Sequence, residues 1–82
     1  MDEKFKYVAR STYRVKVLKS LKTDAKMPKQ IANDSGILTN HISNVLRQLK
    51  EKDIVECINP EVRKGRLYRL SDEGLDILDK LE

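Results

Sequence analysis

The sequence predicts a small, mainly α-helical domain that carries one short β-hairpin. The chain has 82 residues, which is enough for one domain with one small core. Apolar residues recur at helical spacing along most of the chain, so disorder of the whole chain is excluded. Two short apolar stretches flank a charged loop at residues 61–66, which is the pattern of a hairpin. We therefore expect residues 1–82 to form a single domain.

A first helix is expected at residues 12–22. Ser11 or Thr12 can cap its N-terminus, because a hydroxyl oxygen accepts from an unpaired backbone N–H of the first turn. The preceding residues 1–10 carry mixed charges and fit a short strand, an extension of this helix or an N-terminal arm. The apolar stripe of the helix consists of Val17, Leu18 and Leu21.

A second and a third helix follow, separated by a tight turn. Pro28 suits the first turn of the second helix, since its missing N–H has no partner there. Gly36 is expected to end this helix in a left-handed conformation. The third helix should span residues 39–52, with Thr39 as a candidate cap. Its apolar positions have the i, i+3, i+4, i+7 spacing of an amphipathic helix and are Ile42, Val45, Leu46 and Leu49.

The polar face of the third helix is unusual in composition. A face made for solubility favours Lys and Glu, which are strong helix formers. Here the first turns carry residues that form helices poorly but make many kinds of hydrogen bond. Such a conflict between local propensity and structure indicates a functional surface. The residues of this face are Asn40, His41, Ser43, Asn44, Arg47 and Gln48.

A hairpin and a final helix complete the chain. Residues 53–58 and 67–70 are the expected strands, and Asn59-Pro60 breaks the first of them. Ser71 is expected to cap the last helix, with two acidic residues in its first turn. The apolar stripe of this helix contains Leu75, Leu78 and Leu81.

Charge is distributed unevenly along the chain. The net charge is +4. Residues 1–50 hold 11 basic and 4 acidic residues, whereas residues 51–82 hold 6 basic and 9 acidic ones. The basic half indicates a polyanionic partner.

Several classes of site are not supported by the composition. Cys57 and His41 are the only cysteine and histidine, so we expect no disulfide framework and no metal site. No paired carboxylates or phosphate-binding glycine loop are recognisable, which argues against an enzyme and against a cofactor. Since no apolar run is long enough to span a membrane and no signal peptide is evident, a cytoplasmic protein is expected. Cys57 is expected to be a half-buried strand residue.

The order of these elements resembles that of a known family of regulators. A short helix, a glycine turn and a helix with a polar face make a helix-turn-helix, and the basic hairpin after it makes a wing. The chain is therefore similar to prokaryotic winged helix-turn-helix transcriptional regulators of the ArsR and MarR kind, especially small archaeal-type members. The matching segments are Arg14–Leu18, Gln30–Ala32, Ser35–Ile37, His41–Leu46 with Leu49, Lys52–Val55 and Lys64–Gly74.

The resemblance implies sequence-specific binding to double-stranded DNA. The third helix would enter the major groove as the recognition helix, and the wing would contact the backbone or the minor groove. Leu38 stands where the family often has Ser or Thr, and the paired metal-binding cysteines of metal-sensing members are missing. The expected DNA-binding residues are Lys29, Gln30, Thr39, Asn40, His41, Ser43, Asn44, Arg47, Arg63, Lys64 and Arg66.

Two further expectations concern partners. A single small module supplies little contact area on DNA, so a homodimer is expected. The terminal segments should form its interface, with Leu75, Leu78 and Leu81 as apolar contacts and complementary charge setting the register. The alternative function is a winged-helix module that binds protein within a larger assembly, because fold alone does not separate the two.

Overall fold

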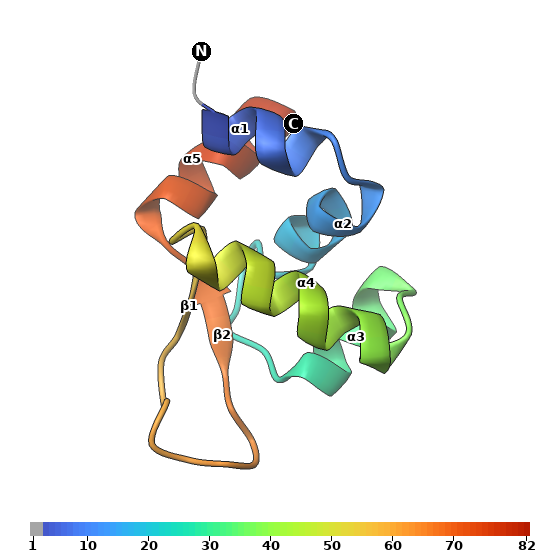
Figure 1. Ribbon diagram of the computed structural model, residues 1–82, viewed down its shortest axis with the longest axis vertical. Coiled ribbons are helices and arrows are strands. Elements are labelled where there is room, and N and C mark those ends of the chain that lie inside the picture. Colours follow the sequence, from blue (N-terminus) through green and yellow to red (C-terminus); the bar gives the residue numbers. More distant parts are fainter. Residues whose placement is uncertain (1–2) are drawn as a thin grey trace.

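Five helices and a two-stranded antiparallel hairpin make up the fold. The computed structural model describes residues 3–82. In Figure 1, α1 and α5 lie together at one end of the molecule, α4 crosses its middle, and the hairpin loop extends at the other end. Within residues 3–82, no helix combines the length and the apolar character that crossing a membrane requires. The elements are α1 (Glu3–Ala9), α2 (Thr12–Ser20), α3 (Pro28–Ser35), α4 (Thr39–Glu51), β1 (Val55–Cys57), β2 (Tyr68–Leu70) and α5 (Asp72–Leu81).

The predicted helices are confirmed, and one of the predicted caps is wrong. The expected range 12–22 ends two residues too late, and 39–52 one residue too late. Ser11 caps α2 as expected, since its Oγ accepts from the Arg14 N–H at 3.3 Å. Thr39 does not cap α4. Leu38 occupies that position without a side-chain hydrogen bond, and Thr39 is the first helical residue.

Residues 3–9 form a separate helix packed on the body, neither a strand nor an arm. Val8 is 0% exposed and belongs to the core. The Arg14 guanidinium stacks on the Tyr7 ring 3.6 Å from its centroid, and its Nη1 donates to the Tyr7 carbonyl at 2.8 Å. Lys4 pairs with Glu73 of α5 at 2.7 Å. Residues 1 and 2 of the expected arm lie outside the described residues.

One hydrophobic core joins all five helices and the base of the hairpin. The apolar stripes expected for α2 and α4 are buried in it. In α5 the stripe is oriented differently from the prediction, because Leu78 is only 2% exposed whereas Leu75 is 47% exposed. Leu78 is therefore a core residue and is not available to a dimer interface. The fully buried large side chains are Val8, Val17, Leu18, Ile31, Ile42, Leu49, Ile54, Ile77 and Val55.

The hairpin is tied to the helices through the loop before α3. Its strands pair antiparallel, with Val55 opposite Leu70 and Cys57 opposite Tyr68. Lys26 adds a bridge on the other edge of β2, because its backbone exchanges two hydrogen bonds of 2.9 Å with Tyr68. Cys57 is half-buried, as expected.

The start of α5 sits directly on the backbone at Ile54. Ser71 N–H donates to the Ile54 carbonyl at 3.0 Å, and Ser71 Oγ lies 2.6 Å from the Asp53 carbonyl oxygen. The same Oγ caps α5 by accepting from the Gly74 N–H at 3.1 Å. A Cβ on Gly74 would lie 2.2 Å from the Ile54 carbonyl oxygen. Only glycine permits this approach.

We expect Gly74→Ala to destabilise the fold by about 1–3 kcal/mol, since the added methyl group must displace backbone in a packed junction. Helix propensity alone gives the opposite sign, because alanine is favoured over glycine by about 1 kcal/mol inside a helix. Urea unfolding measures the difference, with the exposed Asp79→Ala on the same helix as control. A Gly74→Ala variant as stable as the wild type would contradict the close contact.

Candidate nucleic-acid interface

The turn between α3 and α4 is set by glycine and by one buried anchor. Gly36 has a φ of 74°, the left-handed conformation that favours glycine. Its N–H donates to the Ala32 carbonyl at 2.9 Å and ends α3. Ile37 is buried and fixes the turn to the core. The Leu38 carbonyl then accepts from His41 and Ile42 N–H at 3.0 and 3.1 Å, and α4 begins.

The outer face of α4 carries four exposed hydrogen-bonding side chains. They stand opposite the four buried apolar residues that hold the helix to the core. Arg47 Nη2 lies 3.3 Å from Asn44 Oδ1, so these two side chains form a pair one turn apart. The structure thus brings together, on one surface, the predicted residues Asn40, Ser43, Asn44 and Arg47.

The neighbouring flank of α4 faces α2. The His41 ring packs against Tyr13 of α2, with 5.6 Å between ring centroids. Gln48 Oε1 accepts from Arg14 Nη2 at 3.4 Å. His41 is exposed, and its ring contacts a neighbouring helix. Thr39 is exposed at the first turn of α4.

At the N-terminus of α3, the two predicted residues differ in what they can offer a ligand. Gln30 Oε1 accepts from the Met27 N–H at 2.9 Å, so its carbonyl group caps its own helix. Lys29 is exposed beside it. Lys29 therefore supplies a positive charge at the helix N-terminus, where backbone N–H groups also favour an anion.

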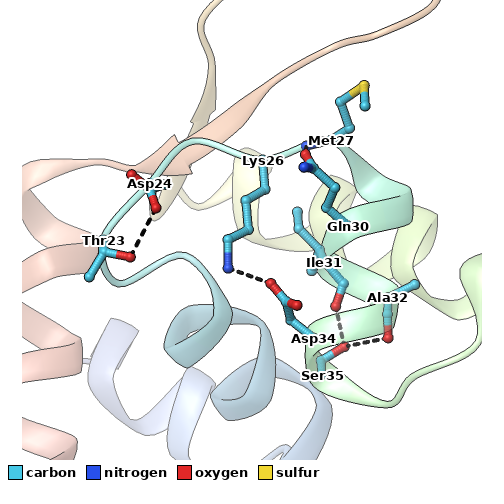
Figure 2. Close-up of polar contacts among 9 residues, drawn as sticks. All are labelled: Thr23, Asp24, Lys26, Met27, Gln30, Ile31, Ala32, Asp34 and Ser35. Carbon is cyan, nitrogen blue, oxygen red and sulfur yellow. Dashed lines mark hydrogen bonds and ion pairs between the residues drawn. The ribbon is translucent and has the colours of Figure 1, made fainter.

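Lys26 holds α3 in place relative to the hairpin. Figure 2 shows its side chain reaching along α3 to an ion pair with Asp34, while Ser35 Oγ donates to backbone carbonyls of the same helix. The Lys26 backbone is the part that bridges Tyr68 of β2. One residue therefore connects the wing to the helix-turn-helix.

The wing loop is organised by two of its own side chains. Asn59 Nδ2 donates to the Gly65 carbonyl at 3.1 Å, and Asn59 Oδ1 accepts from the Leu67 N–H at 2.7 Å. Arg66 Nε donates to the Val62 carbonyl at 2.7 Å, and its Nη2 lies 3.3 Å from the Pro60 carbonyl oxygen. The guanidinium predicted to contact DNA is thus largely occupied inside the loop.

Arg63 and Lys64 remain exposed at the tip of the wing. The loop approaches the start of α3, because a Cβ on Gly65 would lie 4.0 Å from Met27 Sδ. The tip of the wing therefore lies near the N-terminus of α3, where Lys29 is exposed. Across residues 3–82, the structure contains no cluster of three or more His, Cys, Asp or Glu side chains that could hold a metal ion.

Sequence reasoning missed the role of Asn59. The Asn-Pro pair indicated a break in the strand, and this break is confirmed. An Asn side chain in a loop commonly bonds to nearby backbone groups, which was the available signal. The partners of the Asn59 side chain are backbone groups of Gly65 and Leu67, which the second half of the hairpin loop brings back beside it.

Solved structures share the complete fold, although no protein-family model and no curated protein matches the sequence. The MarR family transcriptional regulator SPO1453 from Silicibacter pomeroyi superposes with a TM-score of 0.75 at 18% identity, over 95% of this chain and 58% of its own. The homodimeric winged helix-turn-helix DNA-binding domain of Mb0332 from Mycobacterium bovis, a possible ArsR-family regulator, gives 0.71 at 24% identity, over 94% and 69%. A mutant of MepR from S. aureus gives 0.63 at 17% identity, over 84% and 51%.

These similarities establish the fold: the chain is a winged helix-turn-helix domain. In this fold, α3 and α4 are the helix-turn-helix and the β1–β2 hairpin is the wing. The chain spans a little over half the length of SPO1453.

Proposed function

We propose that this chain binds double-stranded DNA sequence-specifically and acts in the cytoplasm as a transcriptional regulator. The observation that carries the proposal is the composition of the outer face of α4. It exposes amide, hydroxyl and guanidinium groups beside a wing with a basic tip. A surface that binds protein would expose a contiguous apolar patch in these places, whereas the exposed residues on the outer face of α4 are polar and Leu38 is a single apolar residue beside them. The neighbouring structures described as transcriptional regulators support the same function.

The recognition helix has the chemistry to read base edges. Side chains on the N-terminal turns of such a helix reach the major groove. An Asn amide can pair with adenine, and Arg can pair with guanine or with a phosphate. Arg47 Nη2 pairs with Asn44 Oδ1 in the unbound protein, so the amide nitrogen of Asn44 is the group left to donate to a base.

The wing and the start of α3 would contact the DNA backbone. Arg63, Lys64 and Lys29 are exposed cations on neighbouring parts of the surface. Contacts of this kind neutralise phosphates, release counterions and carry no sequence information. They therefore position the domain, while α4 supplies specificity.

We further propose a homodimer that pairs through α1 and α5. Leu75 is the exposed apolar residue of this end, and Leu81 is half-buried. A basic concavity of about 620 Å³ is lined by residues of α1 together with Arg10 and Lys52. An acidic concavity of about 550 Å³, lined by residues that include Asp53, Asp72 and Glu73, lies on the other side of the Lys4–Glu73 ion pair.

Adjacent surfaces of opposite charge suit a two-fold interface. In such an interface, each copy presents the same patch to the other. The basic concavity of one protomer can then face the acidic one of its partner, which fixes the register of pairing. The homodimeric state of the Mb0332 domain supports dimer formation.

Asn44→Ala should lower affinity for the preferred DNA site by about 1–3 kcal/mol, the contribution of a good base contact. Its affinity for random DNA should stay the same, because no phosphate contact is lost. Fluorescence anisotropy on a site selected from a random pool measures both. Asn33→Ala on α3 is the matched control and should keep the wild-type discrimination. Equal losses on both DNAs would exclude Asn44 from base reading, and no DNA binding at all would favour the protein-binding alternative.

The double variant Arg63→Gln/Lys64→Gln should weaken binding to every sequence. The slope of log affinity against log salt should fall by about 1 for each phosphate contact removed. Lys22→Gln/Lys80→Gln removes the same charge from surface ion pairs with Glu82 and Asp76 and should leave the slope unchanged. A wild-type slope in the wing variant would rule out phosphate contacts by the tip.

Leu75→Asp should weaken dimerisation, because it places a charge at the exposed apolar point of the α1–α5 end. We expect the dissociation constant of the dimer to rise by about tenfold or more, which corresponds to ~1.4 kcal/mol. Sedimentation at micromolar concentration measures it. Leu38→Asp makes the same change on the distant α4 end and should not alter assembly. A wild-type protein that stays monomeric both free and on a palindromic site would refute the dimer.

A further inference from the structure

Leu38 is an exposed apolar side chain at the N-terminal tip of the recognition helix. It is 68% exposed, the highest value for a large hydrophobic side chain within residues 3–82. Its neighbour Ile37 is buried in the core. The turn therefore directs one apolar residue inward and the next one outward, next to the polar residues of the outer face.

The backbone of Leu38 is fixed, so the outward position is not a property of a loose loop. Its carbonyl accepts from His41 and Ile42 N–H, and its φ and ψ are −62° and 143°, as an N-cap residue requires. The side chain makes no capping hydrogen bond. Ser or Thr at this position would make one and would stabilise the helix.

Leu38 makes no capping hydrogen bond and leaves an apolar side chain exposed, so this residue does not favour folding stability at this position. A contact outside the folded domain is the remaining reason for a leucine here. Local rules are typically broken in this way at functional sites. The N-terminal turn of a recognition helix is the part that meets base edges. In the major groove, the one apolar group on a base edge is the C5 methyl of thymine.

We propose that Leu38 is a specificity-determining residue that packs on the C5 methyl of a thymine in the major groove. The inference rests on the proposed function and names part of the DNA sequence that the site would take. Asn44 and Arg47 would read polar groups, and Leu38 would select thymine over cytosine, and over uracil, by apolar contact alone.

Deoxyuridine substitution tests this directly, because it removes the methyl group and leaves base pairing unchanged. Each thymine of the duplex selected from a random pool is replaced in turn. We expect one position in each half-site at which the wild-type protein loses about fourfold in affinity, the equivalent of one buried methyl group. Leu38→Ser and Leu38→Ala should bind the thymine and uracil duplexes equally well.

The two variants also separate readout from folding. Leu38→Ser restores a cap and should unfold at a higher urea concentration than Leu38→Ala, while both lose the methyl response. A loss of affinity in the Ser variant is therefore not a loss of stability.

Two other results have different meanings. If the protein selects a sequence but no thymine methyl matters, or if the Leu38 variants keep the full response, the inference is overturned and sequence-specific binding stands. If no sequence is selected over random DNA, the proposed function fails and the inference fails with it.

Discussion

Ile54 is the residue at which the end of α4, the start of β1 and the N-terminus of α5 meet. Its N–H donates to the Leu49 carbonyl at 2.9 Å. Its own carbonyl oxygen accepts from the Ser71 N–H and packs against Gly74. These contacts are made by backbone, so they leave little freedom in angle or distance. The directions of α4 and of the wing are consequently fixed relative to each other. Both halves of the proposed DNA surface depend on this junction.

Polar side chains add further contacts between the elements, and together with the Ile54 junction they form a rigid frame. The proposed functional groups are side chains that take no part in these contacts. Lys26 connects the wing to α3, and Arg14 connects α1, α2 and α4 through Tyr7 and Gln48. An 82-residue domain buries a limited apolar core, so such ties contribute to a defined geometry. The exposed side chains proposed to contact DNA lie on the outer face of α4, at the wing tip and at the start of α3. A rigid frame holding exposed hydrogen-bonding groups is what base recognition requires.

Local patterns in the sequence predicted most of the fold, and contacts between distant segments account for what they did not predict. Helical stripes and the Gly36 turn depend on near neighbours, so their positions were correct to within two residues. Residues 3–9 form a helix too short to be stable alone, and packing against the core stabilises it. Periodicity also grouped Leu78 with Leu75, but the core covers only the former. Likewise, nothing local indicated that Lys26 pairs with β2.

The most direct test of the account is a map of backbone amide shifts when DNA is added. The ¹⁵N-labelled protein is titrated with a selected duplex and with a random duplex of equal length. The account predicts shifts in residues 39–47 that occur only with the selected duplex, and shifts in residues 63–65 with both. Shifts confined to α1 and α5, or an identical response of α4 to both duplexes, would contradict sequence reading by this surface.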